Sequence, residues 1–237
     1  EAAFPPFEFV QDGKIVGYGR DILDVVAEKL GVEIEQLDVP FSGILPGLDA
    51  GKFDFVATSV GVTEERAKAY AFTYPIAVSS EVILKRSDDE SVKSVADLAG
   101  KVVGTQLGTT TQQEAEKAQA SMKAEGKDFK ELKLYPSFPE AYLALTSGEV
   151  DAVVQSLPNA AVLVKEKPDV FALAGPVTDA KRYIAWVTRG SDLDLRDRIS
   201  AILKEMNGSG QLAELQKKWF GFEMDLPADN YLPAGAL

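Results

Sequence analysis

One short pattern occurs twice in this chain and constrains its fold more than any single residue. Residues 48–56 read LDAGKFDFV, and residues 145–153 read LTSGEVDAV. Each copy has the sequence of a helix end, a glycine suited to the left-handed conformation that closes a helix, and a short apolar strand. A helix-to-strand step written twice at this separation indicates two α/β lobes built on one plan.

The residues that follow each copy are the first candidates for a functional site. In open α/β sheets, ligands bind beyond the carboxyl ends of the strands. The first copy leads into Thr58, Ser59 and Gly61, and the second leads into Gln155 and Ser156. The alternative is a chance match, because Leu-x-x-Gly and Asp-x-Val are both common patterns.

Composition excludes several classes of function. The 237 residues suffice for one large domain or two lobes, and a net charge of −12 argues against nucleic acid and anionic membranes as partners. No apolar run approaches the roughly 20 residues that span a bilayer. Cysteine and histidine are both absent, which removes thiolate chemistry, disulfides, the commonest general base and the commonest metal ligand. We therefore expect no metal, no cofactor and no enzyme activity.

Strands and helices alternate along the chain without a long linker. Residues 7–10 and 14–16 form a hairpin signal, residues 21–30 have helical spacing closed by Gly31, and residues 32–37 alternate like a strand. Thr63 is placed to cap a short helix, and residues 137–140 read as a capping box with an early proline. The pattern indicates α/β architecture.

Two sequence features suit an anion. Arg66 lies in the first turn of the short helix, where its guanidinium can bind a carboxylate through two hydrogen bonds. The alternative is a surface arginine paired with Glu64 or Glu65. Residues 108–111, Gly-Thr-Thr-Thr, follow a strand and open a helix, so their amides also suit an anion, although such a turn is often only a helix cap. No phosphate loop or dinucleotide motif is present, which argues against nucleotide binding.

Two aromatic residues next to prolines are candidates for stacking on a ligand. Phe4 precedes two prolines and Phe41 follows one, so both rings can project from loops, whereas Phe7 is expected in the core. Glu1 lies three residues before Phe4 and can offer a carboxylate to a ligand cation; the alternative is an exposed terminal residue.

Several motifs occur in a fixed order along the chain. They are FPPFEF at 4–9, GKIVGY at 13–18, TEER at 63–66, VGTQLGTT at 103–110, the two Leu-x-x-Gly-x-x-Asp elements, and KKWFG at 217–221. This ordered set closely resembles the polar amino-acid family of periplasmic solute-binding proteins, which supply ABC importers. The resemblance covers nearly the whole chain and implies the type II periplasmic binding protein fold: two lobes, each a mixed β-sheet flanked by helices, joined by two crossing strands.

The resemblance also implies boundaries and roles. Lobe 1 is expected at 1–75 and 183–237, lobe 2 at 81–178, and the hinge at 76–80 and 179–182. Arg66 resembles the family's clamp for the ligand carboxylate, the two candidate aromatics match its aromatic sandwich, and Glu1 falls where many members have an acid that contacts the ligand side chain. The ligand-binding residues expected are Glu1, Phe4, Phe41, Thr58, Ser59, Gly61, Arg66, Thr109, Thr110, Thr111, Gln155 and Ser156.

Three positions depart from the family pattern. Ser156 stands where the family often has an aspartate for the ligand α-ammonium, Gly61 stands where it often has a hydroxyl residue, and Gly19 stands where Gly-Phe-Asp-x-Asp has its first acid. Exchanging the charge-assisted contact for a neutral one costs an amine ligand about 1.5–3 kcal/mol. The alternative ligand is therefore a cyclic or N-substituted amino acid, such as ectoine or an opine.

Two other classes of function remain open from sequence. One is an enzyme similar to cyclohexadienyl dehydratase, although the segment where its acid is expected offers only Gln155 and Ser156. The other is the sensing domain of a receptor. The main expectation is a mature or trimmed periplasmic protein, monomeric, that captures a small carboxylate-bearing ligand by hinge closure and delivers it to the membrane subunits of an ABC importer.

Overall fold

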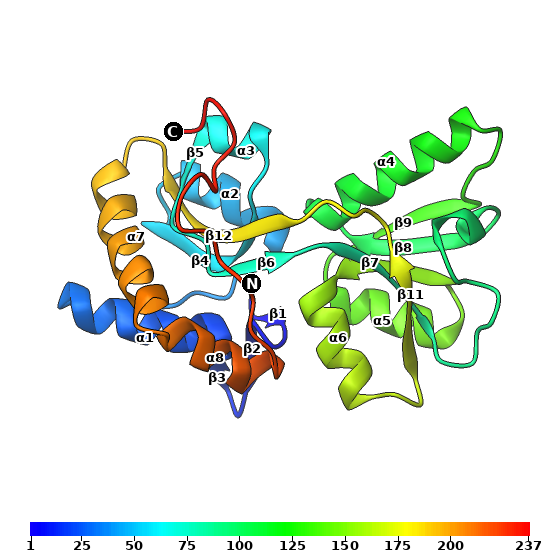
Figure 1. The fold of residues 1–237 in the computed structure, drawn as a ribbon, viewed down its shortest axis with the longest axis horizontal. Helices are drawn as coiled ribbons and strands as arrows, with labels where there is room; N and C mark the ends of the chain where they lie inside the picture. Colours follow the sequence, from blue (N-terminus) through cyan, green and yellow to red (C-terminus); the bar gives the residue numbers. More distant parts are fainter. The chain divides into compact units, whose positions relative to one another are not determined.

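The computed structural model describes residues 1–237, in which helices and strands alternate as the sequence indicates (Figure 1). The chain divides into two compact units, Glu1–Val78 with Arg182–Leu237, and Ser79–Lys181. The first unit is thus built from both ends of the chain. None of the helices combines the length and apolar character that crossing a bilayer requires.

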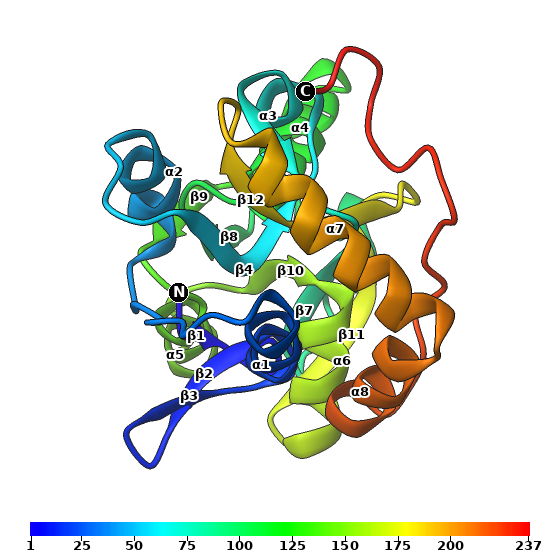
Figure 2. The same ribbon diagram turned by 90° about the vertical axis from the view of Figure 1, so that its left-hand side faces the viewer.

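The first unit holds two antiparallel sheets and five helices. Its sheets have the strand orders β1-β2-β3 and β4-β12-β5, with β6 also paired to β12. Helices α1, α7 and α8 lie together beside the second sheet (Figure 2). The elements are β1 Ala3–Phe4, β2 Glu8–Gln11, β3 Lys14–Val16, α1 Tyr18–Leu30, α2 Phe41–Asp49, β4 Phe55–Gly61, α3 Glu64–Ala69, β5 Tyr70–Phe72, β6 Ala77–Ser79, β12 Arg182–Arg189, α7 Leu193–Gly208 and α8 Gln211–Phe220.

The hairpin near the start of the chain is confirmed. Gln11 pairs with Lys14, and the two residues between them, Asp12 and Gly13, have φ values of 52° and 73°. Two left-handed residues in a two-residue loop match the right-handed twist of the flanking strands. The ring of Phe7 is buried and packs edge-on against Phe220 at a centroid distance of 4.8 Å, as expected for a core residue.

Both copies of the repeated pattern form the helix-to-strand step that the sequence predicts. In the first, α2 ends, Gly51 adopts φ 68°, and β4 follows. In the second, Gly148 closes its helix at φ 78° before the next strand. Only glycine takes this conformation without a steric cost, which is why one stands at the same point of each copy.

The strand expected at 32–37 is not formed. Residues 33–39 make no backbone pairing with any strand, although the apolar alternation is present. A strand requires a neighbouring edge for its amides and carbonyls, and β4, which lies at the edge of its sheet, pairs only with β12. Val32 and Leu37 accordingly stay 51% and 50% exposed.

The second unit is a mixed five-stranded sheet with helices on both faces. The strand order is β11-β7-β10-β8-β9, in which β7 runs antiparallel to both neighbours and β8 runs parallel to both of its own. Figure 1 shows α4 on one side of this sheet and α5 and α6 on the other. The elements are β7 Glu81–Arg86, η1 Val95–Leu98, β8 Val102–Gln106, α4 Thr110–Ala124, β9 Glu131–Tyr135, α5 Phe138–Ser147, β10 Ala152–Ser156, α6 Leu157–Glu166 and β11 Phe171–Pro176.

The capping box expected at 137–140 is incomplete. Helix α5 begins at Phe138 as predicted, but the Ser137 side chain makes no hydrogen bond to the first amides of the helix. Its hydroxyl donates instead to the Glu140 carboxylate at 2.9 Å. The Ser137 hydroxyl therefore contacts the Glu140 side chain and not an amide of the first turn.

Candidate ligand-binding site

Arg66 is buried at the end of β4. Thr63 caps α3 by accepting the Arg66 amide hydrogen at 3.1 Å, which confirms the predicted cap and fixes the first turn that carries the guanidinium. Arg66 is only 8% exposed, so the surface position in the alternative is wrong, although the charge of Glu65 does act on the guanidinium. Burial, followed by the charge of Arg182, lowers the pKa of Arg66 to about 10, and the side chain keeps its charge at neutral pH.

Two of the other candidates surround this guanidinium. Nη1 of Arg66 donates to the carbonyl oxygen of Gly61 at 3.0 Å, and Cζ lies 5.9 Å from the ring centroid of Phe41. Phe41 opens α2 directly after Pro40 and is partly exposed. A guanidinium over a ring face gains cation–π energy and is held flat. The structure therefore brings Phe41, Gly61 and Arg66 together as one cluster.

Phe4 and Glu1 lie at the start of the same unit. The ring of Phe4 stacks on Phe7 at a centroid distance of 5.7 Å and an interplanar angle of 15°. Both Phe4 and Glu1 are partly exposed, and Glu1 lines a cavity described below. The aromatic sandwich and the role of Glu1 stay predictions.

Sequence reasoning missed Glu8, which organises the remaining candidates of this lobe. The residue is 1% exposed, and its Oε2 accepts the Thr58 hydroxyl at 2.9 Å and lies 3.5 Å from Oγ of Ser59. The backbone amide of Ser59 also donates to this carboxyl. The other oxygen, Oε1, is buried without a hydrogen-bond partner. In the sequence, Glu8 is marked only as a single acid between two phenylalanines, a pattern that is also typical of an exposed strand position.

Gly19 of α1 has no side chain, and the Glu8 carboxyl occupies the space that a side chain there would fill. A Cβ atom added at Gly19 would lie 2.1 Å from Oε1 of Glu8. The departure from the family pattern at position 19 is thus compatible with this acid, because a side chain there would require the Glu8 carboxyl to move. Burial away from water raises the pKa of Glu8 to about 7, against smaller opposing effects of the amino terminus, Thr58 and Ser59.

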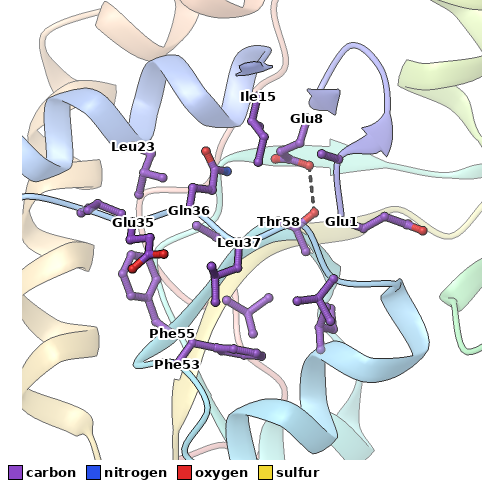
Figure 3. Close-up of a pocket in the computed structure, with 16 residues that line it drawn as sticks. Glu1, Glu8, Ile15, Leu23, Glu35, Gln36, Leu37, Phe53, Phe55 and Thr58 are labelled. Carbon is purple, nitrogen blue, oxygen red and sulfur yellow. Dashed lines mark hydrogen bonds between the residues drawn. The ribbon is translucent and has the colours of Figure 1, made fainter. Parts of the chain in front are cut away.

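A cavity of about 80 Å³ lies beside Glu8 within the first unit (Figure 3). Its charged side chains are all acidic and most of the others are apolar, so it does not suit a carboxylate. The lining residues are Glu1, Ala2, Glu8, Ile15, Leu23, Ile34, Glu35, Gln36, Leu37, Val39, Ile44, Phe53, Phe55, Val56, Ala57 and Thr58.

In the second unit, the three threonines gather at the start of α4. Thr109 donates to the carbonyl of Gln106 at 2.6 Å, and its hydroxyl lies 2.7 Å from that of Thr111. The Thr111 hydroxyl also lies 2.7 Å from Oγ1 of Thr105. These contacts hold the side chains inside the lobe. What the turn offers an anion is its backbone, since the first amides of a helix have no acceptor within the helix.

The end of β10 carries no carboxylate, and its polar side chains make hydrogen bonds within the same unit. Gln155 donates through Nε2 to the Tyr142 hydroxyl and accepts the Ser156 amide hydrogen at 2.6 Å. Oγ of Ser156 donates to Oδ1 of Asn159 at 2.5 Å. The polar groups of Gln155 are thus used within the second unit. No cluster of acidic side chains in the chain has the arrangement of a metal site.

Solved structures with the same fold match nearly the whole chain. An ancestral arginine-binding protein bound to arginine is 36% identical with a TM-score of 0.83, covering 93% of this chain and 96% of that one. The arginine-, lysine-, histidine-binding protein ArtJ from Geobacillus stearothermophilus is 31% identical with a TM-score of 0.84, covering 94% of each chain. The fold is that of the two-lobed periplasmic binding proteins.

Sequence similarity defines the family. The chain belongs to the bacterial extracellular solute-binding proteins, family 3, whose model matches residues 1–222. The L-cystine-binding protein TcyJ of Escherichia coli is 30% identical over 94% of this chain and 82% of its own length. The L-arginine-binding protein of Pseudomonas aeruginosa is 28% identical over 94% of this chain and 87% of its own. These relatives are binding proteins rather than enzymes.

Proposed function

We propose that this protein captures a polar α-amino acid outside the cytoplasm and delivers it to the membrane subunits of an ABC importer. The observation that carries the proposal is the buried Arg66 guanidinium, held between the Gly61 carbonyl and the Phe41 ring in a chain of this family. A desolvated guanidinium that stays charged is a strong partner for a carboxylate. Arg66 is therefore assigned the ligand carboxylate, assisted by the amides at the start of α4.

Arginine is the first ligand to test. Similar proteins are described as binding arginine, histidine or cystine, and one ancestral relative was solved with arginine and with glutamine. In this chain, Phe41 and Phe4 suit a flat or cationic side chain, and Glu1 supplies a negative charge. The periplasm as the compartment, a monomeric state and the lobe boundaries given above belong to the same proposal.

The two lobes are proposed to close around the ligand. A ligand that contacts residues of both lobes binds the closed form more tightly and so shifts the population toward it. Segments 76–80 and 179–182 are the proposed hinge. Small-angle scattering with and without ligand tests closure, which is expected to reduce the radius of gyration.

Isothermal titration calorimetry against arginine, histidine, cystine, glutamine, ectoine and an opine tests the ligand class. Saturable binding of at least one of the four amino acids is expected. Binding of ectoine or the opine alone would contradict the assignment of an ordinary α-amino acid. Binding is proposed to occur without chemical turnover, and recovery of the unchanged ligand by mass spectrometry after incubation checks this.

A further inference from the structure

The carboxyl of Glu8 is the one buried acid that touches the predicted ligand-facing end of β4. Its Oε2 is 2.9 Å from the Thr58 hydroxyl and 3.5 Å from that of Ser59, and it also receives the Ser59 amide. Its other oxygen, Oε1, is buried without a hydrogen-bond partner, and a Cβ added at Gly19 of α1 would lie 2.1 Å from it. The carboxyl therefore faces β4 from behind and is shut off from solvent.

A hydroxyl group carries one proton and two lone pairs. An ionised carboxylate accepts hydrogen bonds and donates none, so a hydroxyl next to it must point its proton inward. The lone pairs of that hydroxyl are then left for a second partner, which has to be a donor. A protonated carboxyl removes this constraint, because it supplies a proton of its own.

We propose that Glu8 is a positioning residue that turns the hydroxyl protons of Thr58 and Ser59 inward, so that the end of β4 presents hydrogen-bond acceptors to the ligand. The group received there is an ammonium or another N–H donor. This matters because β10 ends in Ser156, which offers no carboxylate to an α-ammonium. The inference rests on the proposed function and specifies which lobe receives the ligand's donor group.

The groups around Glu8 determine the pH range in which its carboxyl is ionised and can accept the two hydroxyl protons. The amino terminus acts on Glu8 from the start of the chain and lowers its pKa, while burial raises it to about 7. Glu1 and Glu35 line the cavity beside it, and Arg20 on α1 is paired with Asp24. The chain has no histidine, and the raised pKa of Glu8 places the titration of this carboxyl near neutral pH.

Calorimetry of arginine binding between pH 5.5 and pH 8 tests the inference. We expect the affinity of the wild type to fall about tenfold at the acid end, since a charge-supported acceptor is lost. Glu8→Gln, which mimics the protonated acid, should bind at every pH as the wild type does at pH 5.5. The matched control is Glu35→Gln, which removes an acid from the same cavity and should keep the wild-type profile.

Proton release provides a second readout that a merely structural role would not move. Titrations at pH 7 in buffers of different ionisation enthalpy should show proton release on binding for the wild type and none for Glu8→Gln. Thermal unfolding confirms that each variant is folded. A Glu8→Gln profile that parallels the wild type would overturn this inference alone. Absence of amino-acid binding by the wild type at every pH would overturn the proposed function as well.

Discussion

The guanidinium of Arg66 donates a hydrogen bond of 3.0 Å to the carbonyl oxygen of Gly61, five residues earlier in the chain. This bond ties the first turn of α3 to the last residue of β4. The strand end and the charged side chain are thereby fixed relative to each other. A charge held in this way loses little entropy when it binds an anion.

Replacing Arg66 with alanine should weaken amino-acid binding by at least about 2 kcal/mol, or about 30-fold, because a buried ligand carboxylate loses its partner. Isothermal titration measures the change. Arg198→Ala, at an exposed position on α7, is the matched control and should bind normally. Near-normal affinity in Arg66→Ala would remove this residue from the site.

Phe41→Leu should weaken binding of arginine more than binding of glutamine. Leucine keeps the apolar packing on the core but removes the ring face that supports Arg66 and stacks on a flat cation. The expected loss for arginine is about 1 kcal/mol, measured by calorimetry on both ligands. An equal loss for both ligands would mean that Phe41 acts only through Arg66.

The sequence predicted the parts of the fold that local signals specify. Gly51 and Gly148 mark their helix ends, Thr63 caps its helix, and Asp12 with Gly13 form the hairpin turn, because each depends on one residue type in one conformation. The strand at 32–37 failed for a different reason. Its alternation is local, but strand formation depends on a partner edge elsewhere in the chain.

The candidate site shows the same contrast between features that depend on local sequence and features that depend on partners elsewhere in the chain. Arg66 could be proposed from its place in a helix first turn and from the family resemblance, both of which the sequence displays. Glu8 was missed because its surroundings include Gly19 of α1 and Thr58 of β4, which lie 11 and 50 residues further along the chain. A titratable group is defined by what surrounds it, and single-sequence patterns do not contain that information.

Gly17→Ala should destabilise the fold by at least about 2 kcal/mol. Gly17 has φ 125°, and an added Cβ would lie 2.3 Å from the backbone oxygen of Phe7, which also accepts the Gly19 amide hydrogen at 2.9 Å. Chemical denaturation measures the free energy of unfolding. Gly208→Ala is the control, since nothing lies within 4 Å of a Cβ there and the position ends a helix. That control should be neutral or slightly stabilising, and equal losses in both variants would contradict the steric argument.

Ser156→Asp should raise the affinity for an α-amino acid by about 10- to 100-fold, because it restores a charge-assisted acceptor for the ammonium. Ser156→Asn, which is similar in size but neutral, is the control and should change affinity little. Calorimetry with arginine gives both values. An ammonium has three N–H donors, so the aspartate would add an acceptor to those at the end of β4. An unchanged affinity in the aspartate variant would contradict this prediction and place position 156 out of reach of the ammonium.

The buried Glu8 also predicts how stability depends on pH. Its pKa is raised in the folded state, so between about pH 4.5 and 7 the folded protein binds more protons than the unfolded chain does. The free energy of unfolding should therefore fall as pH rises through this window, with Glu8 contributing about 3 kcal/mol to the decrease. Glu8→Gln removes the ionisable group and should flatten the curve, which makes this variant more stable than the wild type at pH 7. Urea denaturation at a series of pH values measures both curves, with Glu35→Gln as the control that keeps the wild-type slope. Parallel curves for the wild type and Glu8→Gln would show that Glu8 titrates at its ordinary pKa despite its burial.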